Sequence, residues 1–308
     1  MKKLIRKNPF VLAPMDAVTD IAFRELCEEC GCSYSTTELT SVEALVRTFV
    51  PLHRYGRGRL KINSVQLFGS KAEQFVEAAR IVADEADCID VNFGCPSATV
   101  TRNEAGSMLL KDPKQVGKII DALVKHSDKP ITAKIRLGYK KKSYLEVAKE
   151  IEDAGASLIA VHGRTAEQKY SGKANWDAIK EVHETVNIPV VGNGDISRVE
   201  QIDEYLGSHA SALMIGRAAI GNPLIFEEFS HYYKKKEKLI IPDKKEKQKQ
   251  LFMLYLKKLQ DYELHEVHIR VQRQAMWFFK GIEGAKELRV RLMACKTIED
   301  LLACVEEF

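Results

Sequence analysis

The stretch Asp90-Val-Asn-Phe-Gly-Cys-Pro96 has the pattern of a buried strand that ends in a tight turn. Cys88 and the apolar residues after it supply the strand character, while Gly94 and Pro96 are residue types that end strands. Cys95 should therefore lie where the strand ends, with its thiol presented by the turn. The ordinary alternative is an inert thiol, because free cysteine is among the most buried residue types.

On both sides of this stretch, short apolar runs alternate with amphipathic helical patterns. The runs end in Gly, Asn, Asp or Pro, which is the rhythm of βα units. Eight such runs over about 220 residues predict a (β/α)8 TIM barrel rather than an open sheet. The expected strands cover residues 10–13, 34–38, 62–68, 88–93, 131–136, 158–162, 189–193 and 212–215.

After residue 223 the pattern becomes purely helical. We expect residues 1–241 to form the barrel domain and residues 242–308 a small all-α helical bundle, with Pro242 near the boundary. Trp277, Phe278 and Phe279 should form the core of this bundle, the alternative being aromatic surface residues that stack on bases. The expected helices cover residues 224–238, 244–262, 266–280, 285–293 and 298–306.

The composition is that of an ordinary globular protein, with 308 residues of which 45% are hydrophobic. No apolar run approaches the roughly eighteen residues of a membrane span, and the first residues lack the pattern of a signal peptide, so we expect a cytoplasmic protein without a membrane partner. The seven cysteines are irregularly spaced, which predicts reduced thiols. Cys27, Cys30 and Cys32 are not followed by a second Cys/His pair at zinc-finger spacing, so no metal is expected.

The charge is unevenly distributed along the chain. The whole sequence has a net charge of +4, and residues 234–308 contain 17 of the 47 Lys and Arg but only 12 of the 43 Asp and Glu. The positive excess therefore lies in the helical tail. Such a tail is a candidate contact surface for a nucleic-acid backbone, the alternative being solvated helix faces.

Polar and turn-forming residues follow the C-terminal ends of the expected strands. In a barrel these ends form the active-site face, so residues far apart in sequence converge around one opening. Each residue taken alone has an ordinary role as a helix cap or a turn. They are Pro14, Met15 and Asp16, Gln66, Asn92 with Cys95, Lys134 with Arg136, His162 with Arg164, Asn193, Gly194 and Asp195, and Gly216 with Arg217.

Two glycine-rich turns follow the seventh and eighth expected strands, at residues 191–195 and 214–218. Glycine lets backbone N–H groups approach an anion, and a following helix N-terminus adds a favourable field. These turns therefore predict a phosphate site, with Arg217 as a charged contact. No Gly-x-Gly-x-x-Gly follows the first strand, so a Rossmann dinucleotide site is not expected.

The motifs together resemble those of the tRNA-dihydrouridine synthases, flavin enzymes built as a TIM barrel followed by a small helical domain. The resemblance covers essentially the whole chain. The motifs, in the order and at the spacing of that family, are Leu12-Ala-Pro-Met-Asp16, Val65-Gln-Leu-Phe-Gly69, Asp90-Val-Asn-Phe-Gly-Cys-Pro96, Ala105-Gly-Ser107, Thr132-Ala-Lys-Ile-Arg136, Val161-His-Gly-Arg-Thr165, Gly192-Asn-Gly-Asp195 and Ile215-Gly-Arg217.

The resemblance implies FMN across the barrel mouth, with NADPH as its reductant. A flavin needs its phosphate met by the last two turns, and donors near N1 and O2 to stabilise the anion formed on reduction. Lys134 suits the second task with help from His162, and Gln66 can donate and accept along the pyrimidine edge of the ring. The implied flavin-binding residues are Pro14, Met15, Asp16, Gln66, Lys134, His162, Asn193, Gly194, Asp195, Gly216 and Arg217.

The resemblance also implies reduction of the C5=C6 bond of uridines in tRNA, with hydride passing from flavin N5 to C6 and a proton from Cys95 to C5. A thiol that titrates near about pH 8.5 is protonated at neutral pH and can donate. Asn92, Arg136 and Arg164 are the implied substrate contacts. Because the uracil must leave its stack, the helical tail would hold the tRNA by its shape and phosphates.

Three other functions remain open at this point. A flavin barrel similar to dihydroorotate dehydrogenases or ene-reductases would act on a free small molecule. An aldolase-like barrel would use Lys134 as a Schiff-base nucleophile. A catalytically silent tRNA-binding protein would bind tRNA with a steep salt dependence and hold no flavin. The sequence predicts a monomer and does not fix NADPH over NADH.

Overall fold

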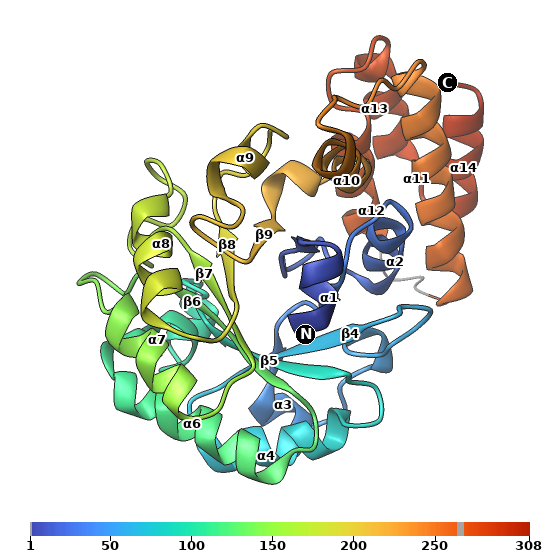
Figure 1. Ribbon diagram of the computed structural model, residues 1–308. Coiled ribbons are helices and arrows are strands. Elements are labelled where there is room, and N and C mark those ends of the chain that lie inside the picture. The colour runs from blue at the N-terminus through green and yellow to red at the C-terminus, as the bar shows by residue number, and fades with distance from the viewer. Residues whose placement is uncertain (1, 264–267) are drawn as a thin grey trace.

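The computed structural model describes residues 2–263 and 268–308 and contains a closed parallel barrel followed by a group of helices (Figure 1). All paired strands run parallel, and β1 pairs with both β9 and β2, which closes the barrel. The predicted fold class is therefore confirmed. The strands are β1 (Phe10–Leu12), β2 (Ser35–Thr36), β3 (Thr40–Ser41), β4 (Asn63–Phe68), β5 (Cys88–Phe93), β6 (Ile131–Arg136), β7 (Leu158–His162), β8 (Val190–Asn193) and β9 (Ala212–Ile215).

The second predicted strand is interrupted in the structure. β2 and β3 both pair with β4, so together they occupy one strand position of the barrel. Between them, the Thr37 hydroxyl accepts a hydrogen bond from the backbone N–H of Gln66 at 2.9 Å. A side chain thus replaces a backbone carbonyl in the ladder, which the sequence pattern of residues 34–38 could not reveal.

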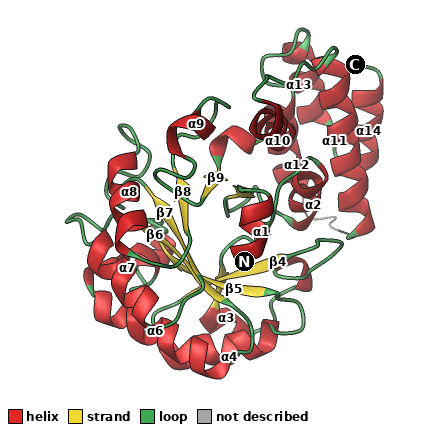
Figure 2. Ribbon diagram, viewed as in Figure 1, coloured by secondary structure: helices red, strands yellow, loops and turns green. Residues whose placement is uncertain are grey.

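Helices surround the strands as expected for βα units (Figure 2). α6 shows why they form: Asp112 caps its first turn by accepting from Gln115 N, Pro113 occupies the first position, and apolar residues recur three and four positions apart on the buried face. The helices of this part are α1 (Lys2–Lys7), α2 (Ile21–Glu29), α3 (Val42–Arg47), α4 (Ala72–Val82), α5 (Ala98–Thr101), α6 (Pro113–His126), α7 (Tyr144–Asp153), α8 (Trp176–Thr185), α9 (Gln201–Tyr205) and α10 (Ile225–Lys235), with short 3-10 turns η1 (Leu52–Arg54), η2 (Gly106–Lys111) and η3 (Arg217–Ala219).

The strands separate an apolar layer from a partly polar barrel interior. In β5, Ile89, Val91 and Phe93 pack into the core shared with the helices. Asp90 and Asn92 alternate with them and therefore face the barrel interior, where both are buried. Near the N-terminal ends of the strands, Ile5 of α1 packs against a smaller apolar cluster. The interior is therefore apolar on this side, and polar interior positions gather around Asp90 and Asn92.

The C-terminal helices form a separate group beside α2 (Figure 1). They are α11 (Lys244–Asp261), α12 (His268–Phe278), α13 (Ala285–Ala294) and α14 (Ile298–Glu306). The predicted start of one helix at residues 266 and 267 lies outside the described residues. Phe278 and Phe279 are buried in this group as expected, while Trp277 is half-buried. The chain passes from the barrel to these helices between α10 and α11, across Pro242.

The helical group is fixed against α2 by buried polar contacts. Lys258 Nζ lies 3.1 Å from Glu25 Oε2 and 2.7 Å from Glu29 Oε1. Gln274 Nε2 donates to the carbonyl of Val18 at 3.0 Å. Since α2 follows the first strand of the barrel, these contacts set the position of the helical group relative to the barrel mouth. Within the described residues, no helix combines the length and apolar character needed to cross a bilayer.

Candidate active site

A cavity of about 720 Å³ opens at the C-terminal ends of the strands. Fourteen of the fifteen site residues predicted from the sequence line this cavity. The fifteenth, Arg164, lies behind the wall and contacts His162 and Asp195, which line it. The lining members of that set are Pro14, Met15, Asp16, Gln66, Asn92, Cys95, Lys134, Arg136, His162, Asn193, Gly194, Asp195, Gly216 and Arg217.

Cys95 lies half-buried in the turn after β5. Its carbonyl accepts from Ser107 N at 3.1 Å, and Gly106 allows this contact because any Cβ there would lie 2.9 Å from that carbonyl oxygen. Burial raises the pKa of the Cys95 thiol and Asp16 adds to the shift, whereas the Ser97 N–H and two nearby cations oppose it. The thiol is therefore protonated at neutral pH and suited to give up a proton.

Asn92 and Gln66 hold the turn that carries Cys95. Asn92 Oδ1 accepts from Gly94 N at 3.0 Å and from Cys95 N at 2.8 Å. Asn92 Nδ2 donates to Gln66 Oε1 at 2.8 Å, and Gln66 Nε2 donates to Asp90 Oδ2 at 2.7 Å. The amide oxygen of Asn92 is thus engaged by backbone, and each Gln66 amide atom retains one further hydrogen-bonding position for a ligand.

Lys134 projects from β6 into the cavity. In the described part of the chain its ammonium forms no hydrogen bond or ion pair, although it is half-buried. Burial, and then the like charge of Arg136, lower the pKa of Lys134 to about 8, while Asp90 acts in the opposite direction. A cation that the protein leaves uncompensated in this way fits an anionic group on a bound ligand.

His162 is neutral at the end of β7. Burial, followed by four surrounding cations, lowers the pKa of His162 to about 2. Its Nε2 lies 3.3 Å from Arg164 Nη1, and a guanidinium can only donate. Nε2 is therefore the acceptor and Nδ1 carries the proton, so the ring can offer one N–H donor to a ligand in the cavity.

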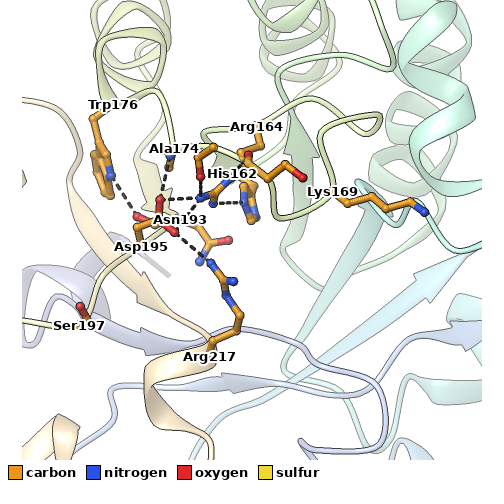
Figure 3. A network of polar contacts seen from close by, with 12 residues as sticks. His162, Arg164, Lys169, Ala174, Trp176, Asn193, Asp195, Ser197 and Arg217 are labelled. Atoms are coloured by element: carbon orange, nitrogen blue, oxygen red, sulfur yellow. Dashed lines mark hydrogen bonds and ion pairs between the residues drawn. The ribbon is translucent and has the colours of Figure 1, made fainter.

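Arg164, Asp195 and Arg217 form an ionic network at the ends of β7, β8 and β9 (Figure 3). Buried Arg164 donates to both Asp195 oxygens, at 2.8 and 2.6 Å, and half-exposed Arg217 donates to Oδ1 at 2.9 Å. Partial burial alone raises the pKa of Asp195, but hydrogen bonds from Arg164 and Ala174 and the charge of Arg217 lower it below its usual value. The carboxylate stays ionised and fixes both guanidinium groups.

Arg136 fastens two loops that border the cavity. It donates from Nε to Gly94 O at 2.9 Å, and from Nη1 to Thr165 O at 3.0 Å and Lys169 O at 2.9 Å. Its Nη2 has no acceptor among the described residues, so one end of the guanidinium remains available to a ligand at the cavity wall.

Sequence reasoning missed several residues of the cavity wall. Tyr170 is 58% exposed at the rim, with its ring centroid 4.7 Å from Arg217 Cζ and 5.8 Å from Arg136 Cζ. Its signal was an isolated aromatic residue in a polar loop after the His-Gly-Arg-Thr motif. Val18, Leu39 and Ile220 also line the wall, and nothing in their sequence context distinguishes them from core residues.

Comparison with known proteins agrees with this geometry. The model of the dihydrouridine synthase family matches residues 11–308. A probable tRNA-dihydrouridine synthase of Aquifex aeolicus is 33% identical over 98% of this chain and 96% of its own. The tRNA-dihydrouridine synthase B proteins of Shewanella oneidensis and Vibrio vulnificus are 36% and 38% identical, over 98% and 92% of this chain and 95% and 90% of theirs.

Solved structures share the barrel. An old yellow enzyme homologue from Zymomonas mobilis superposes with a TM-score of 0.54 at 11% identity, over 76% of this chain and 90% of its own. Histamine dehydrogenase from Rhizobium sp. 4-9 gives a TM-score of 0.52 at 14% identity, over 81% of this chain and 48% of its own. These two structures show the fold. The family match over residues 11–308 and the sequence identities of the relatives show the family. The chain belongs to the dihydrouridine synthase family.

Proposed function

We propose that this protein is a tRNA-dihydrouridine synthase that binds FMN, uses NADPH as reductant and reduces the C5=C6 bond of uridines in tRNA to 5,6-dihydrouridine. One observation carries the proposal: a protonated thiol, Cys95, and an uncompensated ammonium, Lys134, line the same cavity from neighbouring strands. The family membership and the names of the relatives support the same activity.

The residues of the cavity fit a flavin mononucleotide. Lys134 and the Nδ1–H of His162 supply donors for the N1–O2 edge of the ring, and Gln66 offers both a donor and an acceptor. The turns at Gly194 and Gly216 can approach a phosphate, with Arg217 beside them. When bound, the flavin supplies the hydride that adds to C6 of the uracil.

Cys95 has the proton that the product needs at C5. Its raised pKa keeps Sγ–H intact at neutral pH, and the turn held by Asn92 fixes its position. The Nη2 group of Arg136 is a candidate donor to a uracil carbonyl. Arg164 has a different proposed part: its donors are directed at Asp195 and at backbone carbonyls, so it acts on the substrate indirectly, by holding the wall.

The helical tail, residues 242–308, is the proposed tRNA contact. Part of its positive charge is already engaged, since Lys258 is buried against Glu25 and Glu29. Lys244 and Lys247 at the start of α11 are exposed and remain available for phosphates. Because the helices are fixed against α2, docking of the tRNA would orient one flipped uracil toward the cavity.

We propose that the protein acts as a monomer. We place the activity in the cytoplasm, where the proposed substrate is found.

The visible absorption spectrum of the purified protein is the first test. Oxidised-flavin bands, with FMN released on heating, are the expected result. Unmodified tRNA incubated with NADPH should then gain two mass units at a uridine, while free uracil or dihydroorotate should not react.

A colourless protein that cannot be reconstituted with FMN would overturn the redox assignment. Reaction with the free pyrimidine alone would favour the dihydroorotate dehydrogenase-like alternative, and trapping of a carbonyl substrate on Lys134 by borohydride would favour the aldolase-like one.

A further inference from the structure

A buried carboxylate lies below the cavity at the start of the hydrogen-bond chain that reaches Cys95. Asp90 is 5% exposed, and its register neighbours on the adjacent strands are Gln66 and Thr132. Asp90 Oδ2 accepts from Gln66 Nε2 at 2.7 Å, and Oδ1 accepts from Thr132 Oγ1 at 2.6 Å. Asp90 does not line the cavity, so its effect on a ligand must pass through these neighbours.

The two ends of this chain agree on the direction of every hydrogen bond in it. Both Asp90 oxygens accept, from Gln66 and from Thr132, so Gln66 turns its NH2 group toward Asp90 and its oxygen toward Asn92. Asn92 must then present its NH2 group to Gln66 and its oxygen to the turn. Among the described residues the side-chain amide of Gln66 has no backbone partner, so its orientation depends on Asp90 at one end and Asn92 at the other.

We propose that Asp90 is a positioning residue for the thiol of Cys95, acting through the amides of Gln66 and Asn92 on the backbone N–H groups of Gly94 and Cys95. This inference rests on the proposed role of Cys95 as proton donor. If both amides reversed, Asn92 would direct an N–H group at two backbone N–H groups, and the turn would lose both of its acceptor contacts.

We call the hydrogen-bond chain from Asp90 through Gln66 and Asn92 to the turn the relay. It gives the turn an oriented acceptor without placing a charge there. A carboxylate in place of Asn92 would also accept from both N–H groups. It would, however, place a negative charge directly beside the thiol, in the cavity where the proposed anionic ligand would bind, and like charges at short range are unfavourable in a buried site. Asp90 lies two side chains away from Cys95. Burial raises the pKa of Asp90, while the hydrogen bonds from Gln66 and Thr132 and the charge of Lys134 oppose the shift.

A double-mutant cycle at Asp90 and Thr132 tests the direction of the hydrogen bonds. Asp90→Asn alone should keep the relay, because the Thr132 hydroxyl can reverse and accept from the new NH2 group while the remaining oxygen still accepts from Gln66. Thr132→Val alone should also keep it, because the carboxylate still faces Gln66. In the double variant no hydroxyl is left to accept, so the new NH2 group stays unpaired unless it donates to Gln66. That donation reverses Gln66, removes the acceptor of the Asn92 NH2 group and weakens the hold of Asn92 on the turn.

The first readout is hydrogen exchange of the Gly94 and Cys95 amides in the protein without substrate. Each single variant should stay within about threefold of the wild type, whereas the double variant should lose at least about tenfold in protection, the effect of removing a buried acceptor. The second readout is turnover. Dihydrouridine formation should fall about 10- to 100-fold in the double variant while reduction of its flavin by NADPH continues, since that step does not use Cys95.

Two results would overturn the inference. One is a double variant whose folded protein keeps the amide protection. The other is a single variant that loses tenfold by itself, which would show that the cluster responds to any perturbation; this result is decisive even if the double variant does not fold. Asp90→Asn with Thr132→Ser restores a hydroxyl and should recover the wild-type exchange. Amide exchange needs neither flavin nor tRNA, so it can be measured even in a protein without activity. If the exchange rates of the variants change as expected but neither the wild type nor any variant forms dihydrouridine, the positioning role of Asp90 is supported and only the proposed function is wrong.

Discussion

The two sides of the cavity are held in place by different chemistry. On the β4–β5 side, the thiol turn is fixed by neutral amides, Gln66 and Asn92, with one buried carboxylate behind them. On the β7–β9 side, the wall is fixed by two guanidinium groups around the Asp195 carboxylate (Figure 3). Gln66 is fully buried, whereas the Asp195 side chain is 34% exposed and that of Arg217 is 51% exposed.

The difference follows from what each side must do and from how much water reaches it. Charges cost little near the rim, where solvent screens them, and an ionic rim can meet an anionic ligand. Around the thiol, Asp16 already raises the pKa of Cys95 and two cations lower it, so a further charge in the turn would disturb this balance. The proposed function thus assigns the hydrogen-bonded amides to the place where a proton is kept and the ion pairs to the place where an anion is bound. The variants below test this division.

The largest expected effect is on the thiol side. Cys95→Ala should lower dihydrouridine formation about 100- to 10,000-fold, the usual contribution of a general acid, while NADPH still reduces the flavin. Cys295→Ala, at the other half-exposed cysteine of the chain, is the matched control and should keep normal turnover. Mass analysis of the product tRNA measures both, and normal product from Cys95→Ala would remove this residue from the acid's role.

The second effect separates the two arginines of the charged side. Arg164→Met should reduce the free energy of unfolding by about 2 to 3 kcal/mol, because it leaves Asp195 and two backbone carbonyls without a buried donor. Arg217→Met should cost less than about 1 kcal/mol, since that side chain is half-exposed. Urea denaturation of both variants gives the comparison, and equal losses would contradict the assigned difference in burial.

The third effect concerns pH. Lys134 loses its proton as the pH rises through about 8, so the affinity for FMN should fall between about pH 7 and pH 9. Lys134→Met should weaken FMN binding about tenfold at pH 7 and abolish that pH dependence. Fluorescence titration with FMN at both pH values measures this, with exposed Lys141→Met as the control that should behave like the wild type. An affinity of the wild type that does not change with pH would refute the role of Lys134.

The same pKa shift has the opposite consequence for the stability of the flavin-free protein. Between a folded pKa of about 8 and the ordinary value of 10.5, the unfolded chain binds more protons at Lys134 than the folded one. Stability contributed by this group therefore rises with pH across that window.

The smallest effect is expected at the rim. Arg217→Met should weaken FMN binding by only about two- to fivefold, because an exposed guanidinium that is shared with Asp195 contributes little. The titration used for Lys134 measures it under identical conditions. A loss as large as that of Lys134→Met would mean that the charged rim contributes as much to FMN affinity as the half-buried ammonium of Lys134.

Much of this architecture was predictable from the sequence. Apolar runs of strand length between amphipathic helices predict the barrel, because a parallel strand covered on both faces must be apolar. Polar residues where those runs end predict the cavity, because all parallel strands present the same end to one opening. The break between Ser35–Thr36 and Thr40–Ser41 was not predictable, since it depends on the Thr37 hydroxyl meeting a strand that follows much later in the chain.

The sequence by itself thus determined the strand order, the helical tail and the residues that converge on the cavity, because local periodicity and turn chemistry act over a few residues. The tertiary structure decided which partners hold each residue there. Arg164 was expected to contact the substrate, yet it lies behind the wall and holds Asp195. Asp90 was only part of a strand motif until Gln66 and Thr132 were seen on either side of it. Such roles depend on hydrogen-bond direction and burial across strands that are distant in sequence, and no local pattern encodes either property.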